Sequence, residues 1–168
     1  HRPAFGDNRT MSSAAAATTI LELLAYRLQR ASFYTTKHAH MAFAREFGIS
    51  GSEWRLIGTI SVMAPISMLR LAEETDIQLA QTSRTVAALM ERGLVRSEGD
   101  RADKRKVMLL LTPAGRALYR KAFAEASRRN QRILSALSEQ DCLALFRMLD
   151  TVAAEGRVML DEERRRNA

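Results

Sequence analysis

The stretch that decides the fold is 67-SMLRLAEETDIQLAQTSRTVAALMERGLVRSEGDRADKRKVMLLLTPAGR-116. Ser67 is a residue type that caps helices, and a short helical pattern follows from Met68 to Thr75. Asp76-Ile77 is predicted to form a tight turn between this helix and the next. A second helical pattern then runs from Leu79 to Arg92 and ends at Gly93, which suits a left-handed helix end. Two short helices joined by a few residues predict a helix-turn-helix.

The second half of the same stretch predicts a β-hairpin. Leu94-Val95 opens one strand, and the apolar run Val107–Leu111 forms the other. Between them, residues 96–106 contain nine polar or charged residues and one glycine, which indicates a long charged tip. Thr112-Pro113 then starts a new helix, with a capping threonine and a proline in the first turn.

Helical patterns also flank this stretch on both sides. Residues 18–47 contain no Gly or Pro and predict one long helix. Ser50 and Glu53 have the spacing of a capping box for a helix that reaches about Met63, where Ala64-Pro65 breaks it. The helix after Pro113 is expected to extend through Leu137, and Ser138 caps a last helix.

These patterns predict a mainly α protein with a helix-turn-helix, a two-stranded β-hairpin and long terminal helices. The expected parts are a disordered leader (1–12), an N-terminal helix (13–48), a lobe that holds the helix-turn-helix and the hairpin (49–112), and C-terminal helices (113–168), the terminal helices serving dimerisation. The apolar stripes of the terminal helices exceed what a small helix-turn-helix can cover. A two-fold homodimer, in which each chain covers the other, is the economical solution.

Charge is distributed unevenly along the 168 residues. The net charge is +7, and residues 81–132 hold 13 basic and 5 acidic side chains, so that the whole positive excess lies in this window. Such an asymmetry indicates a polyanionic partner. The single cysteine, Cys142, excludes an intrachain disulfide and favours a reducing compartment, and no apolar run approaches the ~18 residues of a membrane span.

The order of these motifs resembles the MarR family of winged-helix transcription regulators. The resemblance covers roughly residues 49–119 and rests on six short motifs in the right order. They are Ser52-Glu53-Trp54-Arg55, Leu71-Ala72-Glu73, Thr82-Ser83-Arg84, Leu89-Met90-Glu91-Arg92-Gly93-Leu94-Val95, Asp103-Lys104-Arg105 and Leu111-Thr112-Pro113-Ala114-Gly115-Arg116. Two positions depart from the family pattern: Asp76 stands where Gly is frequent, and Leu79-Ala80 stands where polar residues are more usual. The resemblance implies a winged helix-turn-helix with a two-stranded β-hairpin wing, in which residues 49–112 are the winged-helix DNA-binding lobe. It also implies a dimeric, cytoplasmic regulator, a repressor, bound to a palindromic double-stranded DNA operator.

Candidate DNA contacts follow from the recognition helix and the wing. Gln can pair bidentately with adenine and Arg with guanine, whereas other contacts from this region go to phosphates. The resemblance implies that Arg105 of the wing reaches the minor groove and that Asp103 holds the wing in shape. The full set of candidates is Ser67, Gln78, Gln81, Thr82, Ser83, Arg84, Arg101, Asp103, Lys104 and Arg105. Gln78, Gln81, Thr82, Ser83 and Arg84 are expected to be exposed.

The signal that releases such a regulator is open at this point. The resemblance implies a small aromatic carboxylic acid, for which an arginine or histidine could hold the carboxylate while aromatics stack on the ring. Candidate contacts are Arg30, Tyr34, His38, Met41, Trp54 and Arg55. A first alternative is thiol oxidation at Cys142, and a second is a basic architectural module that binds DNA without sequence preference.

Nothing in the sequence predicts an enzyme. His38 and His40 diverge on a helix and cannot share a metal ion on one face, and there is no phosphate-cradling glycine loop and no Cys-x-x-Cys. We therefore expect no catalytic residue, no metal and no cofactor.

Overall fold

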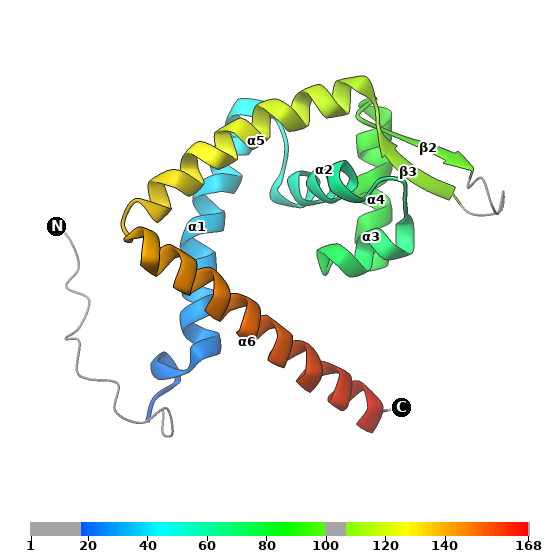
Figure 1. Cartoon of the computed structure of the whole chain (residues 1–168). Helices are drawn as coiled ribbons and strands as arrows, with labels where there is room; N and C mark the ends of the chain where they lie inside the picture. The colour runs from blue at the N-terminus through cyan, green and yellow to red at the C-terminus, as the bar shows by residue number, and fades with distance from the viewer. Residues whose placement is uncertain (1–17, 100–106, 168) are drawn as a thin grey trace. The chain divides into compact units, whose positions relative to one another are not determined.

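The computed structural model describes residues 18–99 and 107–167. Figure 1 shows the course of the chain and the labels of its elements. Contacts divide the chain into one unit that ends at Trp54 and a second that begins at Arg55. Each unit is described by itself below.

The first unit contains a short 3-10 helix, η1 (Ile20–Glu22), and the long helix α1 (Leu24–Phe47). The prediction of one continuous helix from residue 18 is wrong at Leu23, whose backbone is extended with φ −62° and ψ 135°. The Glu22 carboxylate accepts hydrogen bonds from the backbone N–H of Thr18 at 2.7 Å and from the Thr18 hydroxyl. These bonds lower the pKa of Glu22 and hold η1 as a separate turn. Gly48, with φ 62°, ends α1.

Helix α2 (Gly51–Met63) begins with the expected capping box. The Ser50 N–H donates to a Glu53 carboxylate oxygen at 2.7 Å, and the Glu53 N–H donates to Ser50 Oγ at 3.2 Å. This reciprocal pair satisfies donors that the first helical turn leaves open. The helix ends where Ala64-Pro65 was predicted to break it.

The winged-helix lobe consists of α3 (Met68–Thr75), α4 (Leu79–Glu91) and a small antiparallel sheet. The sheet has three strands in the order β1-β3-β2, so that the predicted two-stranded wing, β2 and β3, is joined by a third strand that was not predicted from the sequence. The added strand β1 (Ile66–Ser67) pairs Ile66 with Leu109 just before α3 begins. A two-residue strand shows no alternation in sequence, which is why the pattern did not reveal it.

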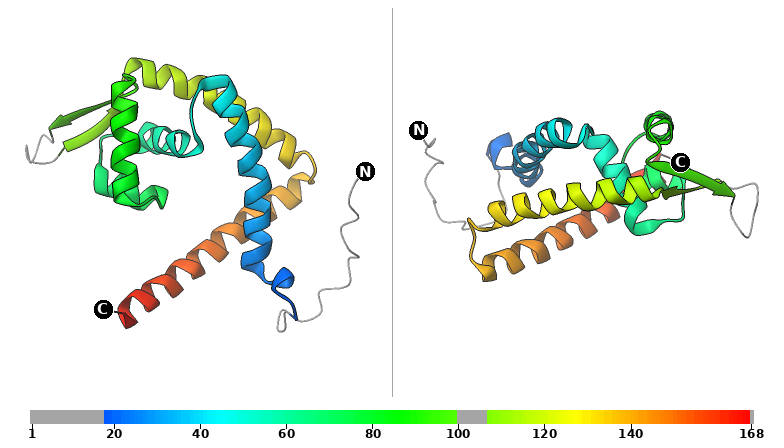
Figure 2. Two further views of the ribbon diagram at one scale, coloured as in Figure 1. Left: turned by 180° about the vertical axis from the view of Figure 1, so that it is seen from behind. Right: turned by 90° about the horizontal axis from the view of Figure 1, so that it is seen from above.

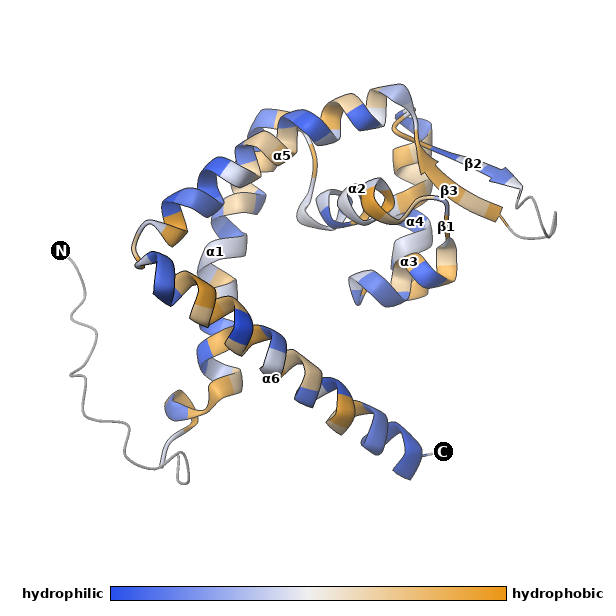
Figure 3. Cartoon of the chain, in the orientation of Figure 1, coloured by the Kyte–Doolittle hydropathy of each residue, from blue (hydrophilic) through white to orange (hydrophobic). Residues whose placement is uncertain are grey.

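The core of this lobe is mainly aliphatic, with buried side chains from α2, α3, α4 and all three strands. Figure 3 shows the apolar residues gathered along α2, α4 and β3. The fully or almost fully buried side chains are Leu56, Ile57, Ile60, Ile66, Leu71, Val86, Leu89, Val95, Leu109 and Leu111.

The wing is a two-stranded ribbon formed by β2 (Val95–Gly99) and β3 (Val107–Leu111). The bounds of β3 are as predicted, but β2 extends through residues 96–99, which were expected to belong to the tip. Only Val95 of β2 is buried, because the following residues of the strand are all exposed. Their pairing with β3, from Val95 opposite Leu111 to Gly99 opposite Val107, makes them a strand despite their charged sequence.

The lobe is followed by two long helices, α5 (Pro113–Leu134) and α6 (Glu139–Arg166). Thr112 caps α5 and Ser138 caps α6, both as predicted, and each hydroxyl oxygen accepts a backbone N–H three residues on. Leu137 was assigned to the first of these helices but lies in the turn between them. Figure 2 shows this turn as the corner of a helical hairpin.

Candidate nucleic-acid interface

The turn between α3 and α4 is fixed by polar contacts at the end of α3. Asp76 takes the left-handed conformation, with φ 50°, that closes the turn. Thr75 is buried, and its hydroxyl donates to the carbonyl of Leu71 at 2.7 Å. Arg55 Nη1 on α2 donates to the carbonyl of Thr75 at 3.0 Å. The turn that orients α4 is therefore held from inside the lobe.

Helix α4 divides into an inner and an outer face. Thr82, Val86 and Leu89 are spaced as one face of a helix and are buried. The prediction that Thr82 is exposed is wrong. Thr82 is 0% exposed, and its hydroxyl donates to the carbonyl of Ile77 at 3.3 Å. Thr82 thus anchors α4 to the turn and presents no group to a ligand outside.

The other α4 candidates lie on the exposed surface. Gln78, Gln81, Ser83 and Arg84 are all exposed, as expected from the sequence. They cluster in the first turns of the helix, the part of a recognition helix that enters the major groove. Leu79 and Ala80 in the same turn are also exposed.

Ser67, the candidate that precedes α3, is half-buried and acts as its cap. Its hydroxyl oxygen accepts the backbone N–H of Arg70 at 3.3 Å. The wing candidates Arg101, Asp103, Lys104 and Arg105 lie outside the residues that the structure describes. Nearer the base of the wing, Arg96 and Glu98 on β2 form an exposed ion pair at 2.7 Å.

The wing is tied to the start of α5 by Thr112. The Thr112 hydroxyl donates to the carbonyl of Gly93 at 2.6 Å, and the Thr112 N–H donates to the carbonyl of Leu94 at 3.0 Å. The same hydroxyl oxygen accepts the N–H of Gly115 at 3.0 Å. Thr112 therefore joins the end of α4, the start of β2 and the first turn of α5 through its side chain and its own N–H.

Four of the predicted ligand residues share one face of α1. Arg30, Tyr34, His38 and Met41 follow each other at intervals of four, four and three residues, the spacing of a single helix face. All four are exposed, with Tyr34 at 63% and Met41 at 67%. Each could therefore be reached by a small molecule.

The two remaining ligand candidates already have structural contacts. The Trp54 ring lies 5.0 Å from the buried Phe43 ring, centroid to centroid, and is half-buried. The Arg55 guanidinium is bound to the carbonyl of Thr75, as described above. These contacts explain both residues without a ligand.

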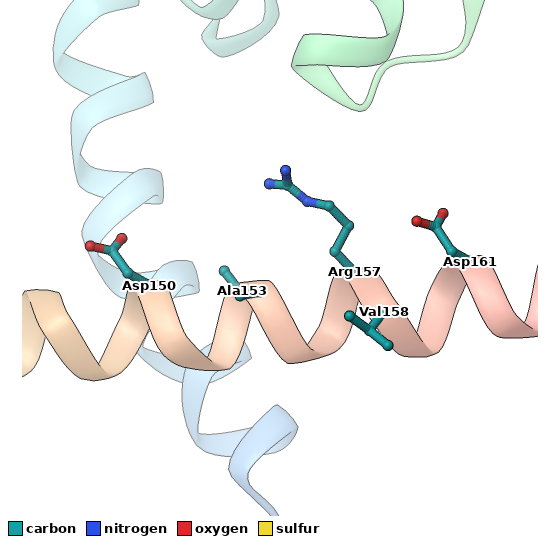
Figure 4. A pocket seen from close by; sticks show the side chains of 6 residues that line it. Asp150, Ala153, Arg157, Val158 and Asp161 are labelled. Carbon is teal, nitrogen blue, oxygen red and sulfur yellow. The ribbon is translucent and has the colours of Figure 1, made fainter.

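A second surface of interest lies on α6, outside the winged-helix lobe. Asp150, Ala153, Arg157 and Asp161 point to the same side of the helix, along a shallow groove (Figure 4). Exposed apolar side chains accompany them along α6. These are Leu143, Leu145, Phe146, Met148, Leu149, Val158, Met159 and Leu160.

The described residues offer little for metal or redox chemistry. Within residues 18–99 and 107–167, no three His, Cys, Asp or Glu side chains gather so that they could hold a metal ion. In the same residues, no helix has the length and hydropathy to cross a membrane. Cys142 is half-buried, with its sulfur 3.7 Å from the carbonyl oxygen of Leu134.

Comparison with known proteins agrees with this architecture. Residues 47–106 match the model of the MarR family. Curated relatives named as uncharacterised HTH-type transcriptional regulators of Staphylococcus aureus are 27% identical over 92 residues, which is 52% of this chain. The chain spans 63% of the length of these relatives.

Two solved structures share the fold over most of the chain. A MarR/EmrR family transcriptional regulator from Acinetobacter sp. ADP1 is 26% identical with a TM-score of 0.72, covering 79% of this chain and 94% of that one. The transcriptional repressor CouR, solved bound to a 23-mer DNA duplex, is 26% identical with a TM-score of 0.70, covering 79% and 93%.

Proposed function

We propose that this chain is a sequence-specific, double-stranded DNA-binding transcription regulator and acts as a repressor, because residues 47–106 match the model of the MarR family. The observation that carries the proposal is the division of α4. Its inner face is anchored by Thr82, while Gln81, Ser83 and Arg84 are exposed in its first turns. The DNA-bound structure of the similar repressor CouR supports it. Such a protein acts in the cytoplasm, where bacterial DNA lies.

Charge supports a polyanionic partner for the same region. Residues 81–132, which include α4, the wing and most of α5, hold 13 basic and 5 acidic side chains. Lysines and arginines that neutralise phosphates release counterions, so that affinity falls as salt rises. In this proposal Arg105 extends the contact from the wing into the minor groove, where narrow A-tracts concentrate negative potential.

A homodimer is part of the proposal because the helices outside the winged-helix lobe carry large apolar side chains that are exposed in the described chain. Exposed apolar side chains lie on η1 and α1 as well as on α6. They include Ile20, Leu21, Leu24 and Phe33 in addition to the α6 residues named above. A two-fold dimer buries the same patch on both copies and presents two recognition helices. When these dock one helical turn apart, about 34 Å, the operator is a palindrome.

The test is a fluorescence-anisotropy titration of the full chain with duplex DNA enriched from a random pool, repeated over a range of salt concentrations. We expect binding to the enriched duplex at least about a thousandfold tighter than to random duplex at the same salt. Arg84→Ala is expected to weaken binding and to reduce the slope of log K against log salt by about one, while Arg105→Ala loses most of the operator affinity. Equal affinity for random and enriched duplex would identify a non-specific architectural module instead.

For the release signal we propose a small aromatic carboxylic acid bound along the exposed face of α1. Arg30 can pair with the carboxylate, and Tyr34 can stack on the ring. Arg55 is not needed, since its guanidinium already serves the end of α3. A ligand of this kind releases DNA only to the extent that it binds the DNA-free conformation more tightly.

Two arginine substitutions test this assignment, with salicylate as the probe. Arg30→Met is expected to keep the melting temperature of the free protein and to abolish its rise with salicylate, because a bound ligand stabilises by mass action. Arg55→Met, the matched control, is expected to lower the free energy of unfolding by about 1 kcal/mol and to keep the salicylate effect. If Arg55→Met alone abolished the salicylate effect, the assignment to α1 would be wrong.

A further inference from the structure

The first turn of α4 carries two apolar side chains on its exposed surface. Leu79 is 48% exposed, and Ala80 beside it is exposed as well. The core of the lobe does not use these two residues, because Thr82, Val86 and Leu89 form the buried face of the helix. Packing in the core of the lobe therefore does not explain why position 79 carries a large aliphatic side chain.

Polar amides lie directly on both sides of this apolar pair. Gln78 precedes it, is exposed, and makes no side-chain hydrogen bond that caps α4. Gln81 follows it and is also exposed. The first turn of α4 thus presents aliphatic carbon next to groups that can both donate and accept hydrogen bonds.

One base pair offers partners for both kinds of group. In the major groove an A·T pair shows the adenine N6 and N7, which suit a glutamine amide, and the thymine 5-methyl, which suits an aliphatic side chain. A G·C pair shows no methyl group at this edge. An aliphatic side chain placed against it would cover hydrogen-bonding groups without giving them partners.

We propose that Leu79, with Ala80 beside it, is a specificity-determining residue that contacts the 5-methyl groups of thymines in the operator half-site. This inference rests on the proposed DNA-binding function and adds the base pair that α4 reads. It assigns A·T pairs to the groove positions under the first turn of α4, with Gln78 or Gln81 on the adenine.

The experiment removes the methyl group from the DNA without altering the protein. Duplexes enriched from a random pool are resynthesised with deoxyuridine in place of each half-site thymine in turn, and their affinities are measured by fluorescence anisotropy. For the wild-type chain, at least one substitution is expected to weaken binding about fourfold, the effect of one buried methyl-sized group.

Substitutions in the protein then identify the side chain. Leu79→Ala is expected to bind the thymine and uracil duplexes equally, whereas Leu79→Met, which keeps an aliphatic contact, retains part of the discrimination. Met90→Ala is the matched control, because Met90 is an exposed apolar residue of the same helix, about three turns further on. It is expected to discriminate as the wild type does.

The outcomes separate this inference from the function on which it rests. Equal affinity of the wild type for every uracil duplex, together with a retained preference over random duplex, overturns the thymine contact and leaves the regulator intact. Unchanged discrimination in Leu79→Ala assigns the methyl contact to another residue and also overturns it. If enrichment returns no preferred sequence, the proposed function and this inference fail together.

Discussion

Thr112 shows how one side chain can hold a small domain together. Its hydroxyl and N–H reach the carbonyls of Gly93 and Leu94, while its oxygen receives the N–H of Gly115. This arrangement requires that the first turn of α5 approach the Leu94 carbonyl closely. Gly115 is buried, and a Cβ built on it would overlap that carbonyl oxygen. A glycine is needed here for space, although its backbone is helical.

Gly115→Ala is therefore expected to lower the free energy of unfolding by about 1–3 kcal/mol, the usual cost of overpacking. The measurement is urea unfolding followed by circular dichroism at a fixed protein concentration. Gly58→Ala is the control, because a Cβ at this helical position in α2 meets only Tyr119, at 3.9 Å. It is expected to raise the free energy of unfolding by up to about 1 kcal/mol through helix propensity. If the two variants were equally stable, the close approach of Gly115 to the Leu94 carbonyl would not be the reason for the glycine.

The inner face of α4 packs against the lobe, and its exposed face is proposed to contact DNA. Substitutions on the inner face should therefore change stability, and substitutions on the exposed face should change DNA affinity. Thr82→Val removes the hydroxyl that donates to Ile77 but keeps the shape of the side chain. We expect it to lower the free energy of unfolding by about 1 kcal/mol and to leave DNA affinity unchanged. Gln81→Ala, on the exposed face, is expected to weaken operator binding by about 1–3 kcal/mol with little effect on unfolding. Loss of DNA binding in Thr82→Val at unchanged stability would contradict this division.

The local signals for these elements could be predicted from the sequence because they act within three or four residues. The Ser50–Glu53 capping box, the caps at Ser67 and Thr112, and the tight turn at Asp76 all appear in the structure as expected. Each depends on a side chain bonding to the backbone beside it, which the order of residues alone reveals.

Features that depend on distant segments could not be predicted in this way. Strand β1 exists because Ile66 pairs with Leu109, and residues 96–99 form a strand because β3 lies opposite them. Thr82 was predicted to be an exposed DNA contact, but it lies on the same buried face of α4 as Val86 and Leu89. Arg55 is bound at the end of α3, twenty residues away in sequence. The strand pairings and the Arg55 contact follow from the fold and cannot be seen in any one helix pattern, whereas the spacing that places Thr82 on the inner face lies within α4 itself.

In the proposed homodimer, two-fold symmetry would pair opposite charges on the two α6 helices. Asp150 and Arg157 lie two turns apart in the same groove, with Ala153 and Ala154 between them. A two-fold axis that passes between these alanines, with the two α6 helices antiparallel, sets Asp150 opposite the partner's Arg157 and also the reverse. The small alanines at the crossing allow the helices to approach closely. In this proposed arrangement, the charges on α6 would match those on a second copy of the helix.

Charge reversal tests this self-complementarity directly. Asp150→Arg or Arg157→Asp alone turns both proposed pairs from attractive to repulsive, and we expect each to raise the dimer dissociation constant about tenfold or more, measured by sedimentation velocity. The double variant, Asp150→Arg with Arg157→Asp, restores two opposite-charge pairs and is expected to recover most of the wild-type affinity. Arg147→Asp, a charge reversal elsewhere on α6, serves as the control and should not be rescued by Asp150→Arg. If the double reversal dissociates as readily as the single ones, the two side chains do not meet across the axis, and the copies pair through another part of their exposed apolar surface.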